Sequence, residues 1–260
     1  QFSASPQYKY SDMTGYGPYV PGIVWFRVYW GIFAVLLALI SIFAWNRGRE
    51  FQFSKKLNAI KEGFRHSSLK MVVGLILAWL LTAGFVFYNT QVLNPYKTKD
   101  QETAASVEYE KQYKKYEHLV QPRVTDVVYH IDLYPEDRRV KIDGVLTLKN
   151  KSNVSIDSLH FTTVRFFTTS LNVKKAKRVY NDEKLKYSIY QLDSPLMPGD
   201  SLVINYTSGY DAKGFENEVS FNSIVDNGSF FNNFDFSPQV GYQPSYELQD
   251  RDKRKKEGLP

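Results

Sequence analysis

The 260-residue chain contains no cysteine, which excludes disulfide bonds, cysteine nucleophiles and thiolate metal sites. It also lacks an HExxH zinc motif, a GxSxG nucleophile elbow and a glycine-rich phosphate loop. Two long stretches have almost no charge, although 23% of all residues are charged. The mean hydropathy of −0.37 therefore averages a very apolar part with a polar one.

Histidine is scarce as well. His66, His118, His130 and His160 stand at spacings that do not let two imidazole rings face one ion. We interpret each of them as structural. The expectation is that this chain holds no catalytic residue, no metal ligand and no cofactor of its own.

The first apolar stretch covers residues 23–45, with Arg27 as its only charge. A helix of this length rises ~1.5 Å per residue and spans a hydrocarbon core of ~30 Å with some tilt. Aromatic rings prefer the headgroup level, and an arginine near a helix end can extend to it. We predict a transmembrane helix with the membrane-interface anchors Trp25, Arg27, Trp30 and Trp45.

The second apolar stretch, residues 71–88, carries no charge. Its small residues form a face on which another membrane helix can pack closely: Gly74, Ala78, Thr82 and Ala83. We predict a second transmembrane helix, so that residues 23–93 form a hairpin. The alternative is a pair of buried helices in a soluble protein, but such helices seldom run this long without charge.

The loop between the spans, residues 46–70, is strongly basic. It contains only two acidic residues. Its basic residues are Arg47, Arg49, Lys55, Lys56, Lys61, Arg65 and Lys70. By the positive-inside rule this loop is cytoplasmic. Residues 1–22 and everything after the hairpin then lie on the far side, which in a bacterial inner membrane is the periplasm. Membrane topology also explains the net charge of +6 better than nucleic-acid binding does.

Within this loop, apolar residues recur at helical spacing, namely Phe53, Leu57, Ile60 and Phe64. A short helix lying on the inner membrane surface fits this pattern. It is either a lipid-lying connector, which we favour, or a contact for a cytoplasmic ATPase.

Residues 94–122 predict a connector helix that leads away from the membrane. Thr98 and Gln101 form a possible capping box, Tyr109 and Tyr113 share one face, and Pro122 ends the pattern. Two dozen residues at 1.5 Å each reach ~35 Å, enough to hold a domain clear of the lipid headgroups. Glu110 and Lys114 form a favourable i, i+4 pair, whereas the other charges are typical of a solvated face.

From residue 123 the apolar period changes to two. Residues 124–134 and 140–149 alternate on either side of the acidic turn 135–137, which predicts a hairpin. Further strand patterns cover residues 156–167, 173–180, 185–192, 201–210 and, weakly, 219–225. Short strands at this spacing without intervening helices indicate an antiparallel β-sandwich over residues 123–246. The predicted fold class is therefore a transmembrane hairpin, a connector helix and an all-β domain.

The segment 221–246 is rich in aromatic residues and asparagine. It either lines a groove or lies buried beneath a following domain, and we favour the second interpretation. The charged segment 247–260 would then lead to that domain.

Specific stretches resemble a known family. The sequences PRVTDVVYHIDLYPEDRRVKIDGVLTLKN (122–150) and PGDSLVINY (198–206) resemble the N-terminal β domain of the M1 family of zinc aminopeptidases. That domain opens with a strand, an acidic turn and a returning strand. The segments YSDMTGYGPY (10–19) and GYQPSYELQD (241–250) look like a bacterial subgroup in which an ABC-2 type permease is fused to an extracytoplasmic M1 domain.

The resemblance implies a parent protein in which a zinc-bound water attacks the peptide bond next to a free amino terminus. The family's HExxH and GxMEN motifs are absent here, so no catalytic or metal residue carries over to this chain. Zinc is expected in a downstream domain beyond Pro260. The implied partners are the lipid bilayer, other transmembrane helices of the permease, the peptidase domain and a cytoplasmic ATPase, with no nucleic acid.

Two other interpretations stay open. The chain is also compatible with a non-enzymatic, membrane-anchored β-sandwich for adhesion, assembly or partner binding. In a third interpretation the permease half exports a substrate that the peptidase-like half only binds.

Overall fold

The computed structural model describes residues 4–8, 10–12, 15–44, 67–94, 97–217, 223–225 and 228–259. It divides the chain into two compact units. The hairpin unit comprises Gln1–Tyr96 and Lys213–Asn222, and the sandwich unit comprises Lys97–Ala212 and Ser223–Pro260. The chain therefore passes between the units three times. Most of the expected connector, residues 94–122, belongs to the sandwich unit.

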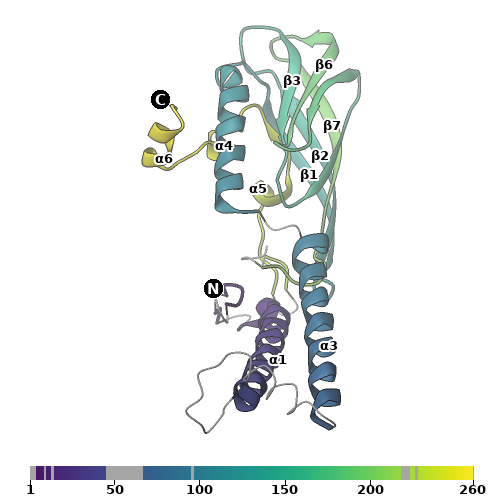
Figure 1. Cartoon of the computed structure of the whole chain (residues 1–260). Coiled ribbons are helices and arrows are strands. Elements are labelled where there is room, and N and C mark those ends of the chain that lie inside the picture. The colour runs from purple at the N-terminus through teal and green to yellow at the C-terminus, as the bar shows by residue number, and fades with distance from the viewer. Residues whose placement is uncertain are drawn as a thin grey trace. The chain divides into compact units, whose positions relative to one another are not determined.

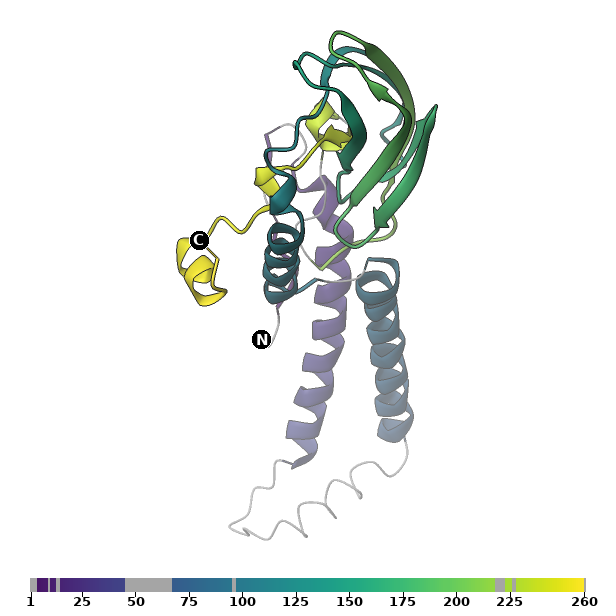
Figure 2. The ribbon, with the colours of Figure 1, turned by 90° about the horizontal axis from the view of Figure 1, so that it is seen from above.

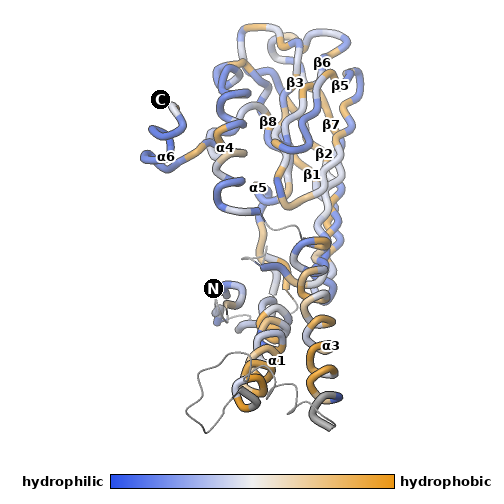
Figure 3. The backbone as a smooth tube through the Cα atoms, in the orientation of Figure 1, coloured by the Kyte–Doolittle hydropathy of each residue, from blue (hydrophilic) through white to orange (hydrophobic). Residues whose placement is uncertain are grey.

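Two long helices dominate the hairpin unit. A 3₁₀ turn, Gly17–Tyr19, leads into α1 (Val20–Ala44), and α3 (Ser67–Phe87) continues as a π-helical turn, Tyr88–Leu93. Both are long and apolar enough to cross a membrane, and only 6% and 11% of their apolar windows are buried. Figure 3 shows apolar residues along both helices. Such exposure suits lipid contact better than a soluble core, and the two predicted helices are confirmed.

Aromatic side chains join α1 to α3. The Trp79 ring stacks on Tyr29 and Phe33, with centroid distances of 5.6 and 5.5 Å. Nearer the other end, Trp25 and Phe85 lie 4.5 Å apart. These large rings contribute contacts between the two helices that the pattern of small residues did not predict.

The structure describes all four residues of the predicted small-residue face and all of the predicted anchors except Trp45. Thr82 is buried, whereas a Cβ on Gly74 would meet nothing within 4 Å. The Trp30 indole donates to the Ala4 carbonyl at 2.9 Å. Lys70 is exposed on α3. Trp45, the amphipathic pattern of residues 53–64 and the other basic loop residues, Arg47, Arg49, Lys55, Lys56, Lys61 and Arg65, lie outside the described residues.

The sandwich unit contains two four-stranded antiparallel sheets (Figure 1), with the orders β1-β2-β7-β4 and β5-β6-β3-β8. The strands are β1 (Arg123–Tyr134), β2 (Arg139–Lys149), β3 (Ile156–Thr162), β4 (Thr168–Val173), β5 (Ala176–Asp182), β6 (Tyr187–Leu196), β7 (Ser201–Asp211) and β8 (Gln239–Val240). The core lies between the sheets: Leu146 and Ile204 of the first pack with Leu159, Phe161 and Leu192 of the second. The antiparallel β fold is thus confirmed.

The strands differ from the prediction in four places. The pattern over residues 156–167 splits into β3 and a loop before β4. The sequence did not reveal this break, because residues 163–167 contain no glycine or proline. The pattern over residues 173–180 contains a turn before β5. The sequence did not predict β8. Of the weak pattern at 219–225, the described residues 223–225 are not a strand.

The connector helix is shorter than predicted. The helix α4 (Lys99–Tyr113) begins with the expected capping box, in which the Gln101 backbone donates to the Thr98 hydroxyl at 3.2 Å. It ends at Tyr113, where a 3₁₀ turn follows. The Tyr113 ring stacks on Tyr187 of β6 at 4.0 Å. Because this aromatic face packs on the second sheet, α4 covers the sandwich instead of standing free as a spacer.

Gly144 is required by its neighbour in the sheet. It lies in the centre of β2, opposite Tyr206 of β7, and a Cβ there would overlap the Tyr206 ring. We expect Gly144→Ala to lower the free energy of unfolding by about 1–3 kcal/mol through overpacking. Thermal or urea denaturation of the chain in detergent measures this loss.

Gly209→Ala in β7 is the matched control, because its nearest neighbour would be a carbonyl oxygen at an ordinary 3.5 Å. It should leave the stability almost unchanged. Equal losses in both variants would show that the Tyr206 contact does not set the requirement at Gly144.

Candidate functional site

The histidines do not form a catalytic or metal centre in the described part of the chain, where no three His, Cys, Asp or Glu side chains could hold an ion together. His118 is 94% exposed at its side chain. His160 is buried with its Nδ1 atom 2.8 Å from the Tyr187 hydroxyl, and burial lowers its pKa from 6.5 to about 4. His130 is exposed on β1, and His66 lies outside the described residues. The clustered polar groups instead hold segments of the chain together.

One such group is the Asn94 side chain in the hairpin unit. Its Nδ2 atom lies within hydrogen-bond distance of the carbonyls of Asn89, Lys213 and Phe215, at 3.1, 2.6 and 3.3 Å. Asn94 stands just before the chain leaves this unit, and Lys213 is where the chain returns. A single amide therefore connects the exit and the re-entry of the chain.

The returning segment packs tightly on the end of the hairpin. Gly214 has a φ of +59°, and a Cβ there would overlap Oδ1 of the buried Asn89. Phe215 is 6% exposed. Its ring lies 6.4 Å from Phe26 of α1 and 6.0 Å from Phe85 of α3. We call Asn89, Asn94, Gly214 and Phe215 the re-entry joint.

The re-entry joint should depend on the donor character of Asn94. In Asn94→Asp the donating amide becomes an acceptor that faces carbonyl oxygens, at a cost of about 1–3 kcal/mol. We expect backbone amides of residues 213–217 to exchange hydrogen about tenfold faster or more.

Gln91→Glu makes the same chemical change on an exposed residue of the same turn and should leave this exchange unaltered. If Asn94→Asp and Gln91→Glu behave alike, Asn94 does not hold the returning segment.

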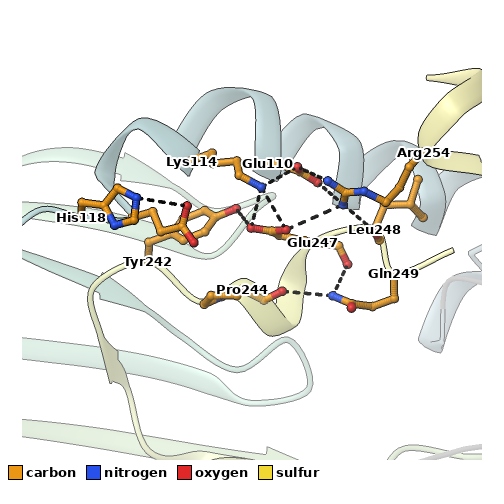
Figure 4. Close-up of polar contacts among 10 residues, drawn as sticks. Glu110, Lys114, His118, Tyr242, Pro244, Glu247, Leu248, Gln249 and Arg254 are labelled. Atoms are coloured by element: carbon orange, nitrogen blue, oxygen red, sulfur yellow. Dashed lines mark hydrogen bonds and ion pairs between the residues drawn. The ribbon is translucent and has the colours of Figure 1, made fainter. Parts of the chain in front are cut away.

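A second polar group lies in the sandwich unit (Figure 4). Glu110 of α4 is 1% exposed and receives both ends of the Arg254 guanidinium, with Nη1 to Oε2 at 2.9 Å and Nη2 to Oε1 at 2.8 Å. Lys114 adds a third contact, from Nζ to Oε1 at 3.0 Å. The predicted Glu110–Lys114 pair is therefore present, but Glu110 is not on a solvated face.

Glu247 balances the charge of this group. It accepts from Lys114 Nζ at 3.3 Å and from the Tyr242 hydroxyl at 2.8 Å. Arg254 also donates to the Leu248 carbonyl at 2.7 Å. Two carboxylates thus meet two cations, which compensates the loss of hydration on burial. We call Glu110, Lys114, Glu247 and Arg254 the C-terminal clamp.

The C-terminal clamp holds part of the segment 247–260, which we expected to lead to a following domain. Arg254 belongs to α6 (Arg251–Lys256), whose first turn is capped by Asp250. In both Figure 1 and Figure 2 this short helix lies beside α4. The aromatic segment 221–246 contributes too, since Tyr242 stacks on Tyr109 of α4 at 5.1 Å. Part of that segment therefore packs within its own unit, while Phe230 and Phe234 are exposed.

The C-terminal clamp makes the free energy of unfolding depend on pH in the acidic range. Burial alone raises the pKa of Glu110, but hydrogen bonds from Arg254 and Lys114 outweigh it and lower the pKa below 4.5. This stabilisation is therefore complete above pH 4.5 and is lost as pH falls through the lower value of the folded state. We expect Glu110→Gln to reduce the free energy of unfolding at pH 7 by about 3 kcal/mol, because Arg254 loses the carboxylate that binds both ends of its guanidinium.

The difference between wild type and Glu110→Gln should stay constant at neutral pH and shrink below pH 4.5, as measured by denaturation across pH. Both proteins keep His160, whose lowered pKa makes the folded state less stable as pH falls from 6.5 to about 4. This loss is the same in both proteins, so it cancels in the difference between their free energies of unfolding. Glu108→Gln is the control, since Glu108 forms only an exposed pair with Lys184. A Glu110→Gln effect as small as that of Glu108→Gln would contradict the clamp.

Comparison with protein-family models and with curated proteins finds no match for this chain.

Proposed function

We propose that this chain is the junction between the last membrane hairpin of an ABC-2 type permease and an M1-type zinc aminopeptidase domain. In this role the hairpin anchors the protein in a bacterial inner membrane. The sandwich supports a peptidase domain in the periplasm and does not itself catalyse the reaction.

The observation that carries the proposal is the arrangement of the stretches that resemble the M1 family. Residues 122–150 supply β1 and β2, which pair along their whole length around the acidic turn. Residues 198–206 supply the start of β7, which pairs with β2. The two stretches are distant in sequence and form neighbouring strands of one sheet, as parts of a common domain should.

The two joints also support an anchoring role. The re-entry joint ties the chain's return to the membrane-length helices. The C-terminal clamp holds the last described helix, α6, against α4. A domain that follows α6 would therefore start from a fixed point, as a supporting module requires.

Zinc has no ligand set among the described residues, so this proposal assigns no metal chemistry to them. The metal would belong to a domain that follows Pro260. There it would activate water for attack on the first peptide bond of a substrate. This chain would contribute position and attachment only.

The test compares the parent protein with this chain. The reading frame after Pro260 should encode HExxH and a distant glutamate within the next domain. Purified parent protein should release the amino-terminal residue from an aminoacyl reporter, lose this activity with a chelator and regain it with zinc. Residues 97–260 alone should do neither.

Two results would contradict the proposal: a reading frame without a zinc motif, or hydrolysis by residues 97–260 alone. The first would favour a non-enzymatic anchored sandwich that binds a partner. A parent with the motif but without activity would instead favour a peptidase-like half that only binds the exported substrate.

A further inference from the structure

One end of the sandwich unit contains a cavity of about 270 Å³ between the edges of the two sheets. Its walls come from β4 of the first sheet, from β5 and β6 of the second and from the turn that joins these two strands. Elsewhere between the sheets, the core is filled with apolar side chains such as leucine, isoleucine and phenylalanine. The cavity therefore stands where the apolar core gives way to polar side chains.

Hydroxyl groups replace apolar side chains at this end. Thr169 of β4 lines the cavity, and its hydroxyl lies 3.0 Å from that of Ser208 in β7. Ser188 of β6 lines the opposite wall and is 6% exposed. In the described part of the chain its Oγ atom has no hydrogen-bond partner. A buried hydroxyl without a partner costs free energy, so it marks a place where a polar ligand group would be stabilised.

Two cationic side chains of the cavity can bind an anionic group of a ligand, namely Lys186 and Arg178. Lys186 is half-buried in the β5–β6 turn and forms no ion pair within the described residues. The Arg178 guanidinium also lines the cavity and carries five N–H donors. Together these cations can bind a carboxylate, for which guanidinium has matching geometry.

Two acidic residues, Asp182 and Glu183, line the same cavity and balance the two cations, so a zwitterionic ligand fits the site better than a simple anion. Both Asp182 oxygens are already used, one by the Leu185 backbone at 2.9 Å and one by the Tyr113 hydroxyl at 2.6 Å. Glu183 is exposed at the rim, where solvent screens its charge. A ligand that carries an ammonium group beside its carboxylate would also find a partner in Glu183.

We propose that this cavity binds the carboxylate of a small ligand, either a free amino acid or the C-terminal end of a short peptide. Lys186 and Arg178 supply the charge, and Ser188 supplies a buried donor. The site lies wholly within the sandwich unit, so it does not depend on a following peptidase domain.

The experiment uses the full chain in detergent and measures binding by calorimetry and by the shift of the melting temperature. Glycine and triglycine are the two probes. Their C-terminal amides, which lack the carboxylate, are the control ligands. Saturable binding of either probe, but of neither carboxamide, is expected. Binding of glycine identifies an amino-acid site, whereas binding of triglycine alone identifies a peptide-terminus site.

Three variants separate a ligand role from a structural one. Ser188→Ala should fold at least as stably as wild type, since it removes an unpaired hydroxyl, but should bind about tenfold more weakly. Lys186→Gln should bind more weakly by a similar factor and keeps the side chain on the same backbone, where φ is 60°. Lys184→Gln, two residues away and paired with Glu108, should bind like wild type.

Absence of saturable binding by both probes would overturn the proposal. Binding that Ser188→Ala and Lys186→Gln leave unchanged would overturn it too, because the ligand would then occupy another place. Equal binding of the carboxamides would show that the carboxylate is not what the cavity recognises.

Discussion

The apolar surface of α1 and α3 has to be covered, and the rest of the molecule depends on how this is done. Large side chains such as Ile42, Leu81 and Phe87 are more than 60% exposed on these helices. In water a surface of this kind would aggregate. A lipid bilayer is the covering we propose, since the two helices have the length and composition to span one. The aromatic stack around Trp79 then joins two helices that lipid surrounds on their other sides.

Polar contacts hold distant segments of the chain together within each unit. Asn94 holds the end of the hairpin next to the returning segment, and α4 begins five residues later. Glu110 of α4 in turn binds Arg254 of α6. Within the sandwich unit, α4 therefore holds the last described helix. Buried ion pairs of this kind add little net stability, but they permit only one geometry, and breaking them is costly.

Local rules explain what the sequence could predict. The two apolar stretches, the capping box at Thr98 and the hairpin of β1 and β2 all depend on neighbours within a few residues. The break between β3 and β4 lacked such a signal, because residues 163–167 contain neither glycine nor proline. The length of α4 was overestimated because charged residues after Tyr113 continue a helical composition without continuing the helix.

The joints could not be predicted, because their partners are far apart in sequence. Arg254 and Glu110 are separated by 144 positions, and Asn94 and Lys213 by 119. A single charged residue on a helix of mixed charge does not reveal that it will be buried. The pair Gly214 and Phe215, directly after the last long strand, was the one local sign of the re-entry joint. The Ser188 cavity likewise becomes visible only once two sheets face each other.

The central claim, a hairpin that places the sandwich on the outer side of a membrane, can be tested by cysteine labelling. The chain has no cysteine, so each introduced thiol reports alone. Lys151→Cys lies in the sandwich unit, and Lys56→Cys lies between the two helices. In spheroplasts, a membrane-impermeant maleimide should label Lys151→Cys at once and Lys56→Cys only after permeabilisation. Labelling of both sites in intact spheroplasts, or of neither, would contradict the hairpin.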